Sequence, residues 1–185
     1  VIYGNVPDTL SQLIRTAFIP GDGYTFAVAD FSAIEARVIA WLAGEEWRLD
    51  VFRTHGKIYE ASASTMFGVP IEKIKKGNPE YALRSKGKVA ELALGYQGAA
   101  GALIQMGALR MGLHEDELPD IVQRWRASNK RIVDLWYSIE RHAAECVEYG
   151  VISSLPNGIS FSRDTDRMMV TLPSGRKLFY LNPQM

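Results

Sequence analysis

The chain has 185 residues, of which 47% are hydrophobic, enough to bury the core of one domain or of one large part of a domain. Lys plus Arg and Asp plus Glu number 21 each, so no global basic field indicates a polyanionic partner, and any such partner would bind local patches. A single cysteine, Cys146, excludes an internal disulfide framework, and neither a secretion signal nor a membrane span is evident, so we expect a cytoplasmic protein with no membrane partner.

The first predicted elements meet at Asp30. Residues 24–30 are short, apolar and rich in strand formers after a Pro-Gly-Asp-Gly turn, which indicates a buried strand. Ser32 and Glu35 have the spacing of a capping box, and apolar residues then recur at helical spacing as far as Gly44. The sequence therefore predicts a strand that ends at Asp30 and a helix that follows at once.

Glycines and prolines divide the following stretch into further helices. These helices are expected at 46–54, 57–67, 70–76, 79–95 and 99–111. A stripe of apolar or small residues at heptad-like spacing then predicts one long helix between Pro119 and Gly150. Alternating runs between Pro- and Gly-containing turns follow it, which is typical of small antiparallel hairpins. The predicted fold class is α/β and predominantly helical, with an early strand, a long helix and C-terminal hairpins.

Asp30 and Glu35 are the first candidate site residues. Asp30 lies where a predicted strand ends, a position at which a carboxylate is held rigidly and remains accessible. Both acids also have ordinary explanations, Asp30 as a turn residue and Glu35 as a cap partner that suits the helix dipole. Two acids at this junction do not by themselves identify an enzyme.

A second group lies on and just beyond the helix predicted at 79–95. Arg84, Lys88, Leu92 and Tyr96 are spaced four residues apart, so they form one oblique stripe. A solvated charged helix face would show the same pattern. A guanidinium and an ammonium one turn apart, followed by an aromatic ring, also suit a triphosphate with a base stacked above it.

Taken together, two stretches resemble the successive signature motifs of family A DNA polymerases, the family of bacterial DNA polymerase I. DFSAIEARVIAWLAGE is similar to the palm motif of that family, and RSKGKVAELALGYQG is similar to its fingers helix. The likeness extends over about residues 12–106, and the variant residues look most like polymerases of phage or prophage origin.

The resemblance implies template-directed DNA synthesis by nucleotidyl transfer, with a DNA primer–template and deoxynucleoside triphosphates as partners and two Mg²⁺ ions as cofactor. It implies that Asp30 and the backbone carbonyl of Phe31 bind metal. Asp30 and Lys88 would be catalytic, Lys88 by neutralising or protonating the leaving group. Glu35 would exclude a sugar 2′-hydroxyl. The implied nucleotide-binding residues are Phe31, Ser32, Glu35, Tyr59, Arg84, Lys88, Leu92 and Tyr96.

Several positions depart from the family pattern. Tyr59 replaces a histidine that touches phosphate, and Leu92 replaces an aromatic residue beside the incoming sugar. Gln97 replaces the glycine that follows the tyrosine, and Phe31 replaces a tyrosine. The family's second metal-binding acid lies in a His-Asp-Glu turn downstream of the fingers. Residues 114–116 are rejected as that turn, because they precede the predicted long helix and their acids suit a helix N-terminus.

This interpretation divides the chain into a partial palm at 1–45, fingers at 46–113, the long helix at 114–150 and short β-hairpins at 151–185. Because the chain starts without methionine and carries one of the two metal-binding acids, we expect a piece of a polymerase that is inactive alone.

Two other functions are compatible with parts of the pattern. The chain could be a noncatalytic nucleic-acid-binding protein, or a helical interaction module that uses the stripe of the long helix. Neither function requires the acids and cations of the two motifs, which favours the polymerase.

Overall fold

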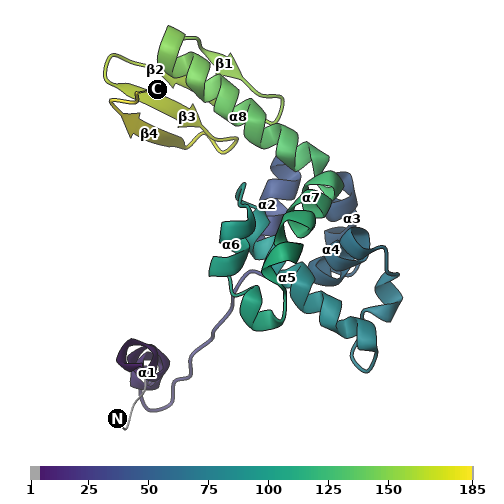
Figure 1. The fold of residues 1–185 in the computed structure, drawn as a ribbon. Helices are drawn as coiled ribbons and strands as arrows, with labels where there is room; N and C mark the ends of the chain where they lie inside the picture. The colour runs from purple at the N-terminus through teal and green to yellow at the C-terminus, as the bar shows by residue number, and fades with distance from the viewer. Residues whose placement is uncertain (1–4, 185) are drawn as a thin grey trace. The chain divides into compact units, whose positions relative to one another are not determined.

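The computed structural model describes residues 5–184, except for the side chain of Asp8, and the chain forms two compact units (Figure 1). The first unit ends at Ser32 and the second begins at Ala33. Residues 1–4 and 185, which the predicted domains include, lie outside the described residues.

The first unit contains α1 (Val6–Leu13), the 3₁₀ turn η1 (Ile14–Ala17) and an extended segment. Residues 24–30 form no strand, so that prediction is wrong. A strand needs a neighbour that completes its backbone hydrogen bonds, and every strand in the described part of the chain belongs to one sheet near the C-terminus. The apolar side chains of the segment are exposed instead, Val28 at 91% of its surface and Tyr24 at 80%.

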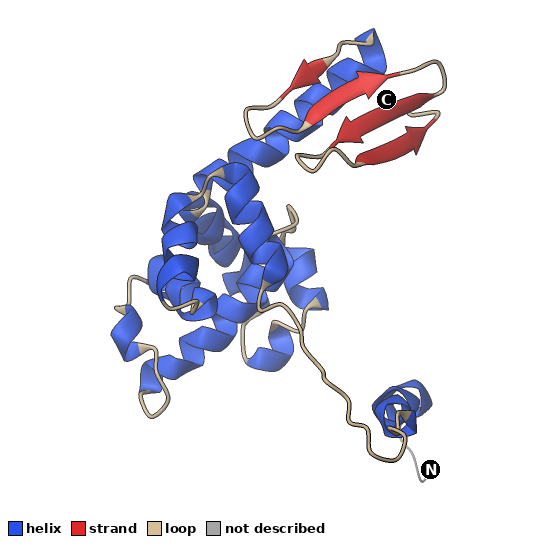
Figure 2. Ribbon diagram, turned by 180° about the vertical axis from the view of Figure 1, so that it is seen from behind, coloured by secondary structure: helices blue, strands red, loops and turns tan. Residues whose placement is uncertain are grey.

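The second unit is mostly helical, which confirms the predicted fold class in this respect (Figure 2). Its helices and 3₁₀ turns are α2 (Ile34–Ala43), α3 (Glu46–Thr54), α4 (Ile58–Phe67), η2 (Ile71–Lys73), η3 (Pro79–Ala82), α5 (Leu83–Leu94), α6 (Ala100–Gln105), η4 (Leu109–Met111), η5 (Glu115–Glu117), α7 (Leu118–Ser128) and α8 (Lys130–Tyr149). Within residues 5–184, every helix is too short or too polar to cross a membrane.

Helix α2 starts differently from the predicted capping box. Its N-cap is Ala33, which adopts a left-handed backbone with φ 49° and makes no side-chain cap. Glu35 is therefore the second helical residue, where its charge still suits the positive end of the helix dipole. The helix ends as predicted at Gly44, whose φ of 65° gives the left-handed C-cap that glycine adopts without strain.

The single long helix predicted between Pro119 and Gly150 is instead two helices, α7 and α8, which meet at Asn129. Asn129 is fully buried, with φ −125° and ψ 50°. Its side-chain Nδ2 donates to the carbonyl of Trp125 at 2.7 Å, the acceptor that its backbone N–H would have in a continuous helix. The side chain thus replaces a backbone hydrogen bond, and this allows the helix to break.

Helix α5 packs against α4, α6 and α7 in one apolar cluster. Its buried face is made of small and medium-sized residues, namely Gly87, Val89, Ala90, Ala93 and Leu94. Gly87 permits a close approach to α4, because a Cβ atom there would lie 2.2 Å from the carbonyl oxygen of Tyr59.

The predicted hairpins are confirmed as an antiparallel sheet in the order β1–β2–β3–β4. Its strands are β1 (Ser153–Ser154), β2 (Ser160–Arg163), β3 (Arg167–Thr171) and β4 (Lys177–Leu181). The sheet packs on α8 through the alternate residues Phe161, Met168 and Val170, which are buried in a second apolar cluster. β4 is an edge strand, exposed at every residue, and among residues 5–184 only β3 pairs with it.

We predict that Gly87→Ala destabilises the second unit although alanine is the better helix former. The added methyl group would collide with the backbone of α4, and such overpacking costs about 1–3 kcal/mol. Urea unfolding measures the change. The control is Gly101→Ala in α6, where a Cβ atom meets nothing within 4 Å and the helix should gain about 0.5–1 kcal/mol. A Gly87→Ala protein as stable as the Gly101→Ala protein would contradict the close approach.

Candidate functional site

The predicted site residues fall in both units. Asp30, Phe31 and Ser32 lie at the end of the first unit, and all three are exposed. The remaining predicted residues belong to the second unit, and they are Glu35, Tyr59, Arg84, Lys88, Leu92 and Tyr96.

The structure brings Arg84 of α5 together with two residues of α4. Its Nε donates to Glu60 Oε1 at 2.8 Å, and its guanidinium lies over the ring of Tyr59, 5.4 Å from the ring centroid. Both charged side chains are at least partly buried, Arg84 at 34% exposure and Glu60 at 14%. Arg84 is therefore already paired in this conformation, and Glu60 is a partner that sequence reasoning missed.

Lys88, Leu92 and Tyr96 share an exposed face of α5 and of the turn that follows it. Leu92 is 40% exposed and Tyr96 is 68% exposed. Lys88 is exposed as well, and within residues 5–184 its ammonium has neither an ion-pair nor a hydrogen-bond partner. This face thus combines an available cation with an apolar side chain and an aromatic ring, as the spacing predicts.

Glu35 and Tyr96 meet at two adjoining hollows between α2 and the end of α5. A cavity of about 60 Å³ is lined by Glu35, Ala36, Ile39, Arg48, Glu91, Gly95 and Tyr96. A second hollow of about 290 Å³ is lined by Glu35, Tyr96 and the apolar residues Ile34, Val38, Ile39 and Leu42. Partial desolvation, and after it the charge of Glu35, raises the pKa of the Tyr96 phenol above its usual value. The two residues therefore face one recess.

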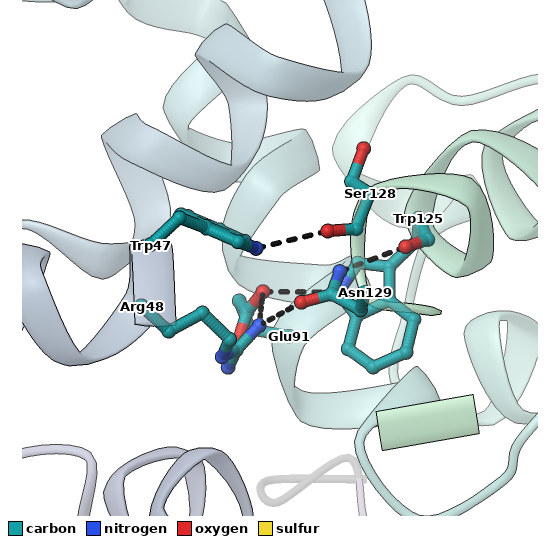
Figure 3. A network of polar contacts seen from close by, with 6 residues as sticks. All are labelled: Trp47, Arg48, Glu91, Trp125, Ser128 and Asn129. Atoms are coloured by element: carbon teal, nitrogen blue, oxygen red, sulfur yellow. Dashed lines mark hydrogen bonds and ion pairs between the residues drawn. The ribbon is translucent and has the colours of Figure 1, made fainter. Parts of the chain in front are cut away.

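Beneath this face lies a buried polar network centred on Glu91 of α5 (Figure 3). Glu91 Oε1 accepts from Arg48 Nη1 and from the Trp125 indole N–H, each at 2.9 Å, and its Oε2 pairs with Arg48 Nη2. Arg48 Nη1 also donates to Asn129 Oδ1 at 2.9 Å. Arg48 and Asn129 are fully buried, and Glu91 is 6% exposed. The network joins α3, α5, α7 and the α7–α8 junction.

Further contacts reinforce the same junction. The Trp47 indole N–H donates to the carbonyl of Ser128 at 2.9 Å, which ties α3 to the end of α7 (Figure 3). Trp125 stacks on Trp136 of α8, with ring centroids 5.8 Å apart. Glu45 accepts from the backbone N–H of Arg131 at 2.9 Å, so a carboxylate sits at the start of α8.

Sequence reasoning missed this network, although one signal was present. Glu91 is a lone acid in the otherwise small and apolar run Val-Ala-Glu-Leu-Ala-Leu. A carboxylate on the buried side of such a helix must be paired, because leaving it unpaired in the interior is very costly. The partner lies 43 residues away in the sequence, at Arg48, and no local pattern identifies it.

Residues 114–117 contain a structural cap, which is formed by Glu117. The His114 backbone N–H donates to Glu117 Oε2 at 2.9 Å, in a capping box that starts η5 and leads into α7. This hydrogen bond holds the pKa of Glu117 below its usual value. Among the residues that the structure describes, no three His, Cys, Asp or Glu side chains are grouped so that they could hold a metal ion.

Comparison with known proteins tests the resemblance to family A DNA polymerases. The family profile described as "DNA polymerase family A" matches residues 4–154, most of the chain. The chain belongs to DNA polymerase family A. The DNA polymerase of Bacillus phage SP02 is 61% identical over 185 residues, which are 100% of this chain and 28% of that protein.

More distant members of family A match shorter stretches. DNA polymerase I of Pseudomonas aeruginosa is 31% identical over 142 residues, which are 77% of this chain and 14% of that protein. The thermostable DNA polymerase I of Thermus aquaticus is 43% identical over 72 residues, 38% of this chain and 9% of that protein. This chain thus spans less than a third of the curated family A relatives to which it was compared.

Gln97 marks a strained departure from the family A motif. It has φ 63°, in the left-handed region that favours glycine, the residue with which the resemblance pairs this position. Gly98 follows, and a Cβ atom there would lie 2.1 Å from the carbonyl oxygen of Ala93. The turn after α5 therefore has a tightly constrained backbone on either side of the Gln97–Gly98 bond.

We predict that Gln97→Gly stabilises the second unit by about 1–2 kcal/mol, since it relieves the cost of a left-handed side-chain-bearing residue. Gln97→Ala is the matched control, because it removes the same side-chain atoms beyond Cβ and keeps the strain. Thermal unfolding should show a higher midpoint for Gln97→Gly than for Gln97→Ala. Equal midpoints would show that the backbone strain is not relieved.

Proposed function

We propose that this chain provides the fingers and part of the palm of a polymerase that carries out template-directed DNA synthesis from deoxynucleoside triphosphates on a DNA primer–template. The observation that supports this function best is the exposed face of α5 and its following turn, which carries Lys88, Leu92 and Tyr96. Tyr96 also lines a recess together with Glu35. In this proposal residues 1–45 belong to the palm, 46–113 to the fingers, and 114–185 connect the fingers to the rest of the enzyme.

Lys88 is the proposed phosphate-binding and catalytic cation. Its ammonium is exposed and free of partners among residues 5–184, so it can bind a triphosphate without first breaking an ion pair. In pyrophosphate release it would neutralise the charge that develops on the leaving group, or donate a proton to it.

Arg84 is the second proposed phosphate ligand, and it has to exchange partners. Its guanidinium is held by Glu60 and stacked on Tyr59, so a phosphate would have to replace the carboxylate. Arginine binds phosphate through two parallel N–H groups, which makes such an exchange favourable for a highly charged ligand. Tyr59 would then act on nucleotide binding indirectly, by supporting the guanidinium of Arg84.

Glu35 and Tyr96 are proposed to contact the sugar and the base. Both line the apolar recess of about 290 Å³ between α2 and the end of α5. A carboxylate at the rim of this recess would exclude a ribose 2′-hydroxyl by its size, and the exposed ring of Tyr96 offers a surface on which a base can stack. Leu92, between Lys88 and Tyr96, would form an apolar side of the same site.

Family A polymerases use metal ions. We propose that Asp30 and the carbonyl of Phe31 contribute to that site, with Ser32 beside them, and that the complete enzyme holds two Mg²⁺ ions. Asp30 is the one carboxylate that the resemblance assigns to the metal ions in this chain, and a single carboxylate does not balance the repulsion between two dications. The residues present therefore fit only part of the metal site, and we expect the 185-residue chain alone to extend no primer.

The alternative of a helical interaction module has lost its main support. The stripe that suggested it is used inside the second unit, since Ile121, Trp125, Ile132 and Cys146 are each at most 3% exposed. A noncatalytic nucleic-acid-binding role remains the second candidate, because exposed lysines surround η2 and the turn after it.

We predict that Lys88→Ala lowers kcat/KM for deoxynucleotide incorporation by about 10²–10³, since it removes a charge-assisted contact to the leaving group. The measurement is single-nucleotide primer extension by a full-length polymerase that carries this segment. Lys86→Ala is the control on the same helix, because Lys86 points elsewhere and pairs with Glu117 at 3.6 Å. Equal values of kcat/KM for the two variants would overturn the role of Lys88.

A second prediction concerns the sugar. Glu35→Ala should lower the discrimination between deoxynucleotides and ribonucleotides by about 10–100-fold, because space replaces the carboxylate at the rim of the recess. Glu35→Gln keeps the size of the side chain and should retain most of the discrimination. Competition between dNTP and rNTP in the same full-length polymerase tests this, and unchanged discrimination in Glu35→Ala would restrict Glu35 to its place in the first turn of α2.

A further inference from the structure

We infer that Arg48 and Glu91 are positioning residues for the nucleotide-binding face of α5, whose buried ion pair fixes the rotation of that helix and thereby the placement of Leu92 and Tyr96 beside Glu35. This inference rests on the proposed function for its effect on nucleotide binding. The structural part of it, the control of the end of α5 by a distant ion pair, stands independently.

The hydrogen bonds of Glu91 are directional, as a residue that fixes the rotation of α5 requires. Both carboxylate oxygens are engaged by Arg48, and one of them also accepts from the Trp125 indole N–H. These donors come from two different helices, α3 and α7. A carboxylate that receives planar, paired N–H groups from fixed directions satisfies them in one orientation only. A rotation of α5 would therefore separate all of these contacts at once.

Apart from the partly exposed ion pairs of Arg84 with Glu60 and of Lys86 with Glu117, the remaining contacts of α5 do not define its rotation as sharply. Its buried face consists largely of glycine, alanine, valine and leucine. Apolar contacts between such side chains are not directional, so they resist separation of the helices more strongly than small rotations. The close approach at Gly87 limits how far α5 can move from α4, but the charge pair limits how it can turn.

The ion pair also reaches the proposed nucleotide site directly. Arg48 and Glu91 line the cavity of about 60 Å³ together with Glu35 and Tyr96. The Nε atom of Arg48 is buried and has no hydrogen-bond partner in the described part of the protein. Glu91 is adjacent in sequence to Leu92 and lies one turn after Lys88. Arg48 and Glu91 thus line the cavity beside Glu35 and Tyr96, and they also hold α5 in place.

The test compares Glu91→Gln with Val89→Ala, a control on the same buried face of α5. Glu91→Gln keeps the size of the side chain and removes the charge that Arg48 binds, whereas Val89→Ala removes two methyl groups and leaves the pair intact. In the 185-residue chain, hydrogen exchange is measured at the amides of residues 92–96, with urea chosen so that the two variants have equal global stability. In the full-length polymerase, kcat and KM for deoxynucleotides are measured separately.

If the inference is right, exchange at residues 92–96 is faster by about tenfold in Glu91→Gln than in Val89→Ala, and KM rises by a similar factor while kcat changes little. Equal exchange in the two variants overturns it, because Glu91 would then supply stability alone. Should Glu91→Gln fail to fold, Arg48→Lys, which keeps the charge and loses the paired geometry, takes its place. Failure of both to fold also overturns the inference, since the pair would be needed for folding itself. Absence of primer extension by the unsubstituted polymerase would overturn the proposed function, and the exchange measurement would still decide the positioning role.

Discussion

The carboxylate of Glu91 is buried in the second unit, and the arrangement of the surrounding helices depends on how it is neutralised. Arg48 supplies the compensating charge from α3, and Trp125 and Asn129 complete the hydrogen bonding from α7 and its junction with α8. Removing one partner of such a pair costs about 3–5 kcal/mol, because the other charge stays buried. The helices that carry these residues must therefore assemble together, and the exposed side of α5 is placed as a consequence.

Helix α5 has a buried face that packs in the interior and an exposed face that carries the candidate site residues. The buried face is made of small residues that let α4 approach within contact of the Gly87 backbone, interrupted only by the charged anchor. The opposite face carries Lys88, which has no ion-pair or hydrogen-bond partner among the described residues, and exposed apolar and aromatic side chains, which contribute little to the packed interior. Because the two faces share one backbone, the contacts that fix the buried face also fix the positions of the exposed side chains. Arg84 differs from its neighbours on the stripe, since Glu60 and Tyr59 already hold it.

Local signals in the sequence predict most of the helices and all of the hairpins, because glycine, proline and alternation act within a few residues. The strand at 24–30 and the continuous helix from 119 to 150 are wrong for a common reason. A strand exists only with a partner. At Asn129, where the helix breaks, the side chain replaces a backbone hydrogen bond to Trp125 and also accepts from the buried Arg48, 81 residues away. For the candidate site, the motifs predict which residues to consider, and the spacing predicts the common face of Lys88, Leu92 and Tyr96. Neither the diversion of Arg84 to Glu60 nor the network beneath α5 has a local signature.

The free edge of β4 has a consequence for how the chain behaves in concentrated solution. Leu178, Phe179, Tyr180 and Leu181 are consecutive, each at least 45% exposed, and the backbone groups on the outer side of the strand have no partner strand among residues 5–184. An apolar edge of this kind is a template for strand pairing between molecules. Arg176 and Lys177 precede it and Pro183 follows it, and charge and proline at the ends of such a segment oppose stacking in register. Association of the isolated chain through β4 would therefore involve a strand far along the sequence from the residues proposed for chemistry, and it should respond to ionic strength through Arg176 and Lys177.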